Sequence, residues 1–268
     1  MALWHTLLRA IAVLNLALWS ISAVAVTSGQ AGSHARPDMA LDMQLLLSAG
    51  YVAGCAFRSL LPVYDIPRLV LVDSRFSCVL VGRSVATLAE LCFAAQWALI
   101  VHRVAVITGS PLGQAVSMAI VPLIVLAEGW SWHAVLSTAH RSHVVENSLW
   151  GASAALLVVS LLVIGPHRLA ELYPPIIAWC VGGVVYVAFM FLFDVPMYWS
   201  RWLADQTNKR RYLSIRDGVV DVCRNWTVSY RWEDWKGEVL WMSLYFTVGV
   251  WVSVSLIYAS AALSEAPR

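Results

Sequence analysis

Charged residues are scarce in this chain: Asp, Glu, Lys and Arg make up 13% of its 268 residues. Soluble domains carry about 25% charged and about 45–50% apolar residues, whereas 60% of this chain is hydrophobic and its mean hydropathy is +0.70. This composition excludes a disordered chain, a disulfide-stabilised mini-protein and a nucleic-acid-binding domain. The net charge of +2 gives no field that points to an acidic partner. We therefore expect an integral membrane protein with several spans and no nucleic-acid partner.

Several familiar site motifs are absent. The five cysteines form no CxxC pair, which argues against a zinc ribbon or a disulfide framework. Lysine occurs only at Lys209 and Lys236, so no lysine lies in the last apolar segment to form a retinal Schiff base. The chain has no HExxH sequence, no P-loop and no serine-nucleophile motif. These absences exclude an opsin. Any functional residues are therefore expected among the polar residues scattered through the apolar segments.

Seven apolar segments are long enough to cross a membrane as helices, which requires about 20 residues each. They lie at 3–26, 43–63, 77–101, 112–135, 144–164, 174–197 and 239–263. The fold class that we expect is an all-α bundle of about seven transmembrane helices, a single polytopic membrane domain over 1–268. Residues 1–26 also fit a signal peptide with a cleavage site at Ala23-Val24-Ala25, but an uncleaved first span is the preferred interpretation.

The distribution of basic residues predicts the orientation of these spans. The segment 198–238 is rich in basic residues: Arg201, Lys209, Arg210, Arg211, Arg216, Arg224, Arg231 and Lys236. The positive-inside rule places this segment in the cytoplasm, with a cytoplasmic N-terminus and an outer C-terminus. The segment also gathers tryptophans, so we interpret it as an interfacial aromatic and basic loop that anchors in lipid headgroups, or as a lid that admits a lipid or docks a partner. The membrane that we expect is a bacterial inner (plasma) membrane.

Ionisable residues inside the spans are the strongest functional signal, because each costs about 2.5–3.5 kcal/mol at a helix centre and is retained with a partner. With the orientation above, they all fall in the cytoplasmic half: Arg58, Arg83, Glu90, Glu128, His143, Glu146 and Asp194. This predicts one polar pocket between the helices. Its carboxylates outnumber its arginines, so the excess negative charge requires a metal cation, shared protons or histidinium.

One sequence, His140-Arg-Ser-His143-Val-Val-Glu146, has the spacing HxxHxxE at the start of a span. On a helix its three polar side chains cover an arc of about 120°. Imidazole and carboxylate ligands suit iron, zinc or manganese, so His140, His143 and Glu146 are candidate metal ligands. Two alternatives remain: interfacial histidines hydrogen-bonded to headgroups or backbone, and a haem ligand.

The two intramembrane arginines also have two interpretations. Arg58 and Arg83 can be structural partners of Glu90 and Asp194, or they can bind a phosphate or carboxylate headgroup through the guanidinium fork. Asn147 and Trp150, which follow His143 on the same side of the helix, join them as candidate substrate-binding residues. Arg83 and Glu90 are about 10 Å apart along a helix axis, so we expect their partners on other helices.

The lead hypothesis is a membrane-embedded enzyme that acts on a lipid or isoprenoid-like substrate. Glu90, Glu128 and Asp194 are its candidate catalytic acid/base groups. The layout is loosely similar to small seven-span lipid hydrolases with His/Asp metal sites and to small seven-span terpene cyclases, but no motif of either is matched, so no residue role is carried over. The alternatives are a non-catalytic subunit of a membrane complex, with membrane-protein partners, and a proton- or cation-coupled transporter. Membrane lipids are expected partners in each case.

Overall fold

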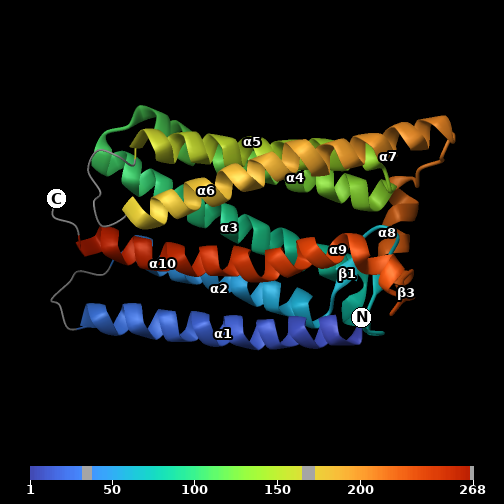
Figure 1. Cartoon of the computed structure of the whole chain (residues 1–268), viewed down its shortest axis with the longest axis horizontal. Helices are drawn as coiled ribbons and strands as arrows, with labels where there is room; N and C mark the ends of the chain where they lie inside the picture. Colours follow the sequence, from blue (N-terminus) through green and yellow to red (C-terminus); the bar gives the residue numbers. More distant parts are fainter. Residues whose placement is uncertain (32–37, 165–172, 266–268) are drawn as a thin grey trace. The chain divides into compact units, whose positions relative to one another are not determined.

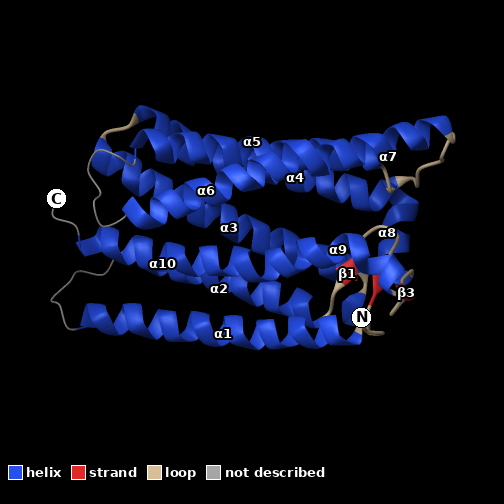
Figure 2. Cartoon of the chain, in the orientation of Figure 1, coloured by secondary structure: helices blue, strands red, loops and turns tan. Residues whose placement is uncertain are grey.

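The structure is a computed structural model that describes residues 1–31, 38–164 and 173–265. These residues are predominantly helical, with three very short strands (Figure 2). The elements in chain order are α1 (Ala2–Ala31), α2 (Met39–Leu60), β1 (Val63–Tyr64), β2 (Leu69–Val70), the 3-10 turn η1 (Arg75–Ser77), α3 (Val79–Thr108), α4 (Pro111–Ser137), α5 (His140–Ile164), α6 (Tyr173–Phe189), the π-helical turn η4 (Met190–Asp194), α7 (Val195–Thr207), α8 (Ile215–Arg224), β3 (Thr227–Val228), α9 (Trp232–Leu244), the π-helical turn η5 (Tyr245–Gly249) and α10 (Val250–Glu265).

Among the residues that the structure describes, seven helical stretches are long and apolar enough to cross a membrane. They are Ala2–Gly29, Met39–Leu60, Val79–Thr108, Pro111–Ser137, His140–Ile164, Pro174–Thr207 and Trp232–Ser264. We call the sixth stretch, which comprises α6, η4 and α7, span 6, and the seventh, which comprises α9, η5 and α10, the last span. Each stretch overlaps one predicted apolar segment, so the predicted count of seven is confirmed and the chain is a helical multi-pass membrane protein.

The loop predicted at 198–238 is shorter in the structure, because both flanking spans continue into it. Helix α7 extends span 6 to Thr207, and α9 begins the last span at Trp232. No glycine or proline occurs between Pro196 and Gly218 to stop α7, and acidic residues in the first turn of α9 favour a helix start there. The connection is therefore 208–231, and it contains the short helix α8.

The chain forms two compact units. Unit 1 comprises Met1–Ile100 and Trp226–Arg268, and unit 2 comprises Val101–Asn225. Helix α3 begins in unit 1 and ends in unit 2. Each unit contains several of the apolar spans.

In unit 1, α1, α2 and the last span lie side by side (Figure 1). Near the start of α1, Trp4 Nε1 donates a hydrogen bond of 3.1 Å to the hydroxyl of Ser243 in the last span. Further along α1, Trp251 Nε1 donates to Asn15 Oδ1 at 3.2 Å, so α1 and the last span run parallel. Helix α2 runs antiparallel to the last span.

A small three-stranded sheet adjoins the start of α1 in unit 1. Strands β1 and β2 pair antiparallel, and β2 pairs with β3 in parallel, in the order β1-β2-β3. The fully buried Trp235 lies beside this sheet: its indole ring is 5.8 Å from that of Trp4 and 6.3 Å from the ring of Tyr64. The indole N–H is satisfied by the carbonyl of Ser229 at 2.9 Å. The sheet and Trp235 thus join the segments around 64 and 229 to the start of α1.

In unit 2, α4 and α5 form an antiparallel helical hairpin that turns at Thr138, which has a left-handed φ of 59°. Span 6 packs antiparallel along α5, and glycines permit the close approach at two levels. A Cβ on Gly183 of α6 would lie 2.4 Å from Val158 Cγ2 of α5, and a Cβ on Gly151 of α5 would lie 2.7 Å from the ring of Phe191. Small residues at such contacts let helices pack closely in a membrane. This register brings the start of α5 beside η4 and α7.

Candidate functional site

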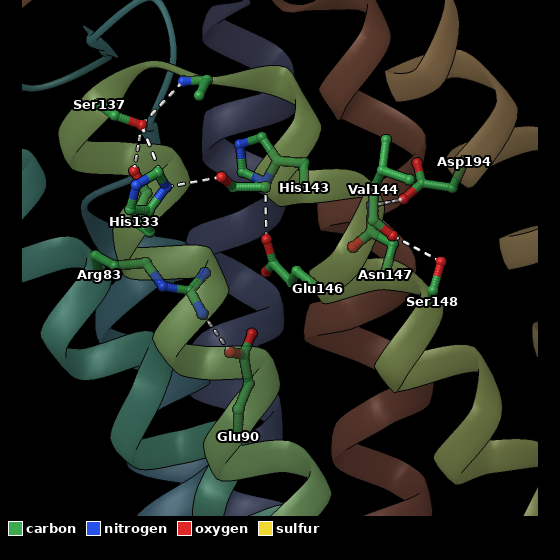
Figure 3. Close-up of polar contacts among 12 residues, drawn as sticks. Arg83, Glu90, His133, Ser137, His143, Val144, Glu146, Asn147, Ser148 and Asp194 are labelled. Atoms are coloured by element: carbon green, nitrogen blue, oxygen red, sulfur yellow. Dashed lines mark hydrogen bonds and ion pairs between the residues drawn. The ribbon is translucent and has the colours of Figure 1, made fainter. Parts of the chain in front are cut away.

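The first turns of α5 carry a buried histidine–carboxylate pair. His143 Nδ1 lies 2.7 Å from Glu146 Oε2, and the two side chains are 13% and 10% exposed (Figure 3). Residues three apart on a helix are neighbours, so the local sequence is sufficient to place this pair. A carboxylate accepts hydrogen bonds, so the tautomer that satisfies this contact has its proton on Nδ1 and its lone pair on Nε2. This arrangement is that of a carboxylate-oriented general base.

A second polar pair lies beside the first, because Asn147 directly follows Glu146 on α5. Asn147 Nδ2 donates a hydrogen bond of 2.5 Å to Asp194 Oδ2 (Figure 3). Asp194 is the last residue of the π-helical turn η4, in which the N–H of Val195 bonds the carbonyl of Met190, five residues back. Pro196 has no N–H to donate, so the regular hydrogen-bond ladder is already interrupted at this level. Such widened turns are frequent at functional sites, and this one presents a carboxylate to α5.

An aromatic ring of α7 covers the histidine. The ring of Tyr198 lies 4.6 Å from that of His143, with the planes inclined by 34°. The guanidinium carbon of Arg201 lies 5.3 Å from the centroid of the same tyrosine ring. The histidine is thus separated from a cation by one aromatic ring.

Further toward the start of α5, a third carboxylate is surrounded by donors. Asp205 Oδ2 lies 2.8 Å from His140 Nδ1, and Tyr212 donates to the same oxygen at 3.2 Å. Arg210 Nη1 lies 3.3 Å from Asp205 Oδ1. Burial, and next the negative charge of Asp205, raise the pKa of the Tyr212 phenol above its ordinary value. These contacts connect the end of α7 and the residues that follow it to α5.

Helix α4 contributes polar residues to the same unit. His133 Nδ1 lies 2.7 Å from the hydroxyl of Ser142 on α5, and the hydroxyl of Ser137 donates to the carbonyl of His133 (Figure 3). Glu128 is 3% exposed on α4. Trp150 is half-buried on α5, one turn beyond Asn147. The candidate residues of unit 2 therefore come from α4, α5 and span 6.

The predicted intramembrane arginines and Glu90 belong to unit 1. Arg83 Nη2 lies 2.8 Å from Glu90 Oε2 on the same helix, α3. The expectation that both need partners on other helices is wrong for this contact, because two extended side chains bridge the two turns between them. Glu90 has a cross-helix partner as well: Tyr245, the first residue of η5, donates to its Oε1 at 3.1 Å. Arg58 donates to the carbonyl of Val63 at 3.1 Å.

The predicted metal ligands do not form a cluster. Within 1–31, 38–164 and 173–265, no group of three or more His, Cys, Asp or Glu side chains is arranged to hold a metal ion. His140 and His143 each direct Nδ1 to a different carboxylate, Asp205 and Glu146. The prediction of iron, zinc or manganese bound by His140, His143 and Glu146 is therefore unsupported by the geometry.

Comparisons with known proteins add no family. No protein-family model matches this sequence, and no curated protein or solved structure is significantly similar to it.

Three residues around the site are absent from the sequence-based candidates: Tyr198, Arg201 and Asp205. A signal for them exists, because Asp194 and these three residues follow the spacing i, i+4, i+7, i+11, which is one face of a helix. The predicted loop 198–238 contains these three residues, so the prediction does not place them on a helix face with Asp194. Tyr245 has no comparable signal, since nothing in the sequence relates it to Glu90.

Proposed function

We propose that this protein is a membrane-embedded enzyme that performs acid/base chemistry on a lipid or isoprenoid-like substrate. The observation that carries the proposal is the buried His143–Glu146 pair, in which Nδ1 of the imidazole lies 2.7 Å from the carboxylate. In the tautomer that satisfies this contact, Nε2 carries the lone pair that accepts a proton. A histidine with a purely structural role at a membrane edge would be stabilised as well by a hydrogen bond to the backbone or to a lipid headgroup. Such a histidine would not require a second buried ionisable group beside it.

The arrangement suits proton transfer at His143. Nε2 accepts a proton from a hydroxyl group or a water molecule, and the carboxylate of Glu146 stabilises the imidazolium that forms. Asp194 accepts a hydrogen bond from the amide of Asn147 and is a second carboxyl group that contacts α5. In its protonated form it would donate its own proton to a leaving group. Glu128 remains a candidate acid on α4. Arg58 and Arg83 are less suited to hold substrate charge, because their guanidinium groups already bond Val63 and Glu90.

The position of the pair favours an amphiphilic substrate. His143 and Glu146 lie within two turns of the start of a span, where lipid headgroups and acyl chains meet. Residues 208–225, the part of the basic connection that belongs to unit 2, adjoin this end of the unit, since the N–H of Leu213 bonds the carbonyl of Ser137 at 3.0 Å. With the positive-inside rule, we place the site on the cytoplasmic side of a bacterial plasma membrane.

The test uses purified full-length protein in nanodiscs made from a bacterial lipid extract, supplemented with polyprenol and polyprenyl phosphate, and follows new lipid products by mass spectrometry. His143→Gln and Glu146→Gln should each lower the rate of product formation about 100-fold or more, because general acid/base groups contribute about 10²–10⁴-fold. The matched control is His102→Gln. His102 contacts Ser117 on α4, at the opposite end of the hairpin from His143.

Three results are informative. Loss of product in both variants with full activity in the control supports the proposal. Wild-type rates in His143→Gln and Glu146→Gln, with retained tryptophan fluorescence and size-exclusion profiles, would refute the assigned base. Absence of any product with the wild-type protein would favour a non-catalytic subunit of a membrane complex or a transporter.

A further inference from the structure

Two arginines near the site keep their guanidinium groups over aromatic rings. Arg201 of α7 lies over Tyr198, and the guanidinium carbon of Arg141 of α5 is 6.0 Å from the ring centroid of Trp202. The ring of Trp199 lies 4.7 Å from that of Trp202, in an edge-to-face arrangement. These residues, Arg141, Tyr198, Trp199, Arg201 and Trp202, form what we call the arginine platform.

The N–H donors of these two guanidinium groups have no hydrogen-bond acceptor among the described residues. Within the part of the chain that the structure describes, neither Arg141 nor Arg201 makes a hydrogen bond or an ion pair. Arg210 is different, because it contacts Asp205 at 3.3 Å. Stacking on an aromatic face orients a guanidinium group and leaves its N–H fork directed outward. The platform therefore offers two oriented forks.

The chemistry that fits such forks is a phosphate group. Phosphate and carboxylate oxygens match the guanidinium geometry in a bidentate manner, and arginine is preferred where this match matters. The platform is accessible, since Arg141 is exposed and Trp199 is 47% exposed. Tryptophans at a helix end mark the headgroup level of a membrane, which is where the phosphate of a lipid lies.

The platform is continuous with the proposed catalytic pair. The Tyr198 ring contacts Arg201 on α7 and faces the His143 ring at 4.6 Å. Toward the interior of the span, η4 exposes Leu192 and Phe193, which are 67% and 64% exposed. A ligand with a phosphate group and an apolar chain would find a cation, an acid/base pair and an apolar surface on neighbouring turns.

We propose that Arg141 and Arg201 bind the phosphate of a membrane-embedded phosphate ester and position the adjacent atoms at His143. This inference rests on the proposed function and specifies its substrate class: a phosphate carried on an apolar chain, whether of glycerolipid or isoprenoid origin. In this proposal both arginines hold the phosphate and neither touches the imidazole, since the Tyr198 ring is the group that contacts both Arg201 and His143.

The binding test does not depend on turnover. Native mass spectrometry of the full-length protein in an uncharged detergent is titrated with three probes: phosphatidic acid, diacylglycerol with the same chains, and inorganic phosphate. We expect phosphatidic acid to bind more tightly than either of the others, because it alone has both the phosphate and the chains. Two additional probes, isoprenyl phosphate and isoprenol, distinguish an isoprenoid source from a glycerolipid source.

The Arg141→Gln/Arg201→Gln double variant should weaken phosphatidic acid binding about tenfold or more, because one hydrogen bond to a charged group accounts for about that factor. Its matched control is Arg216→Gln/Arg224→Gln, which removes the same charge from the exposed face of α8. This control should bind as the wild type does. Replacing both platform arginines with lysine should restore only part of the affinity, since lysine keeps the charge but loses the fork.

The outcomes separate this inference from the proposed function. Equal affinity of the Arg141→Gln/Arg201→Gln variant and the wild type, equal binding of diacylglycerol and phosphatidic acid, or no binding of either phosphate ester would overturn the phosphate site. His143→Gln should still bind phosphatidic acid. Binding that depends on the arginines together with wild-type turnover in His143→Gln would sustain the phosphate site and refute the catalytic pair.

Discussion

Two adjacent glycines of α6 provide a sharp test of the helix packing in unit 2. A Cβ on Gly183 would lie 2.4 Å from Val158 Cγ2, whereas a Cβ on Gly182 would meet no atom within 4 Å. The Gly183 contact is about 1 Å shorter than 3.4 Å, the lower limit of an ordinary van der Waals contact. Val158 is β-branched and buried on α5, so its side chain cannot rotate away without cost.

Gly183→Ala should therefore force α5 and span 6 apart and lower the free energy of unfolding by about 1–3 kcal/mol, the usual cost of overpacking. Gly182→Ala adds a methyl group in open space and removes a glycine from a helix, so stability should stay the same or rise by up to about 1 kcal/mol. For a chain of this length the loss in Gly183→Ala corresponds to a thermal midpoint lower by about 2–10 °C.

The assay is thermal unfolding in detergent followed by intrinsic fluorescence, for which the 14 tryptophans provide a strong signal. Adding Val158→Ala to Gly183→Ala removes the clashing methyl group and should reverse most of the decrease in the thermal midpoint. Such non-additivity is expected for two residues in direct contact. Equal midpoints for Gly182→Ala and Gly183→Ala, or no recovery in the double variant, would refute the antiparallel register of α5 and span 6.

Two further predictions concern α8 and α3. Gly218→Ala places a Cβ 2.1 Å from the carbonyl oxygen of Leu136, so α8 should detach from α4 and be cut faster by trypsin, while Gly237→Ala, in open space, should show the wild-type digestion pattern. Glu90→Gln removes the carboxylate beside the buried guanidinium of Arg83 and should cost about 3–5 kcal/mol of unfolding free energy in a denaturant titration. Replacing both Arg83 and Glu90 with methionine should cost less than Glu90→Gln alone, and a larger cost for the double replacement would contradict this assignment of the ion pair.

The sequence identifies several site residues because their presence in an apolar segment is costly. Glu146 and Asp194 are recognisable on this ground, and the spacing of His143 and Glu146 predicts that they share a helix face. The partner of Asp194 is not recognisable, because the contact with Asn147 depends on the register of two helices and on the π-helical turn Met190–Asp194. The sequence also indicates a metal cluster, whereas the structure directs His140 to Asp205, a residue of the segment that the sequence suggests is a loop.

The number and position of the seven spans follow from the apolar segments of the sequence alone. The free-energy cost of exposing backbone or charged groups to lipid is local and can be summed along the chain. The division into two units and the partners of each buried charge do not follow from it. They depend on which helix faces approach one another, and that choice is made by small residues such as Gly183 and by side-chain contacts between residues far apart in the sequence. Arg83 and Glu90 illustrate the difference. The sequence predicts that both lie inside an apolar span, but their direct contact requires side-chain conformations that packing imposes.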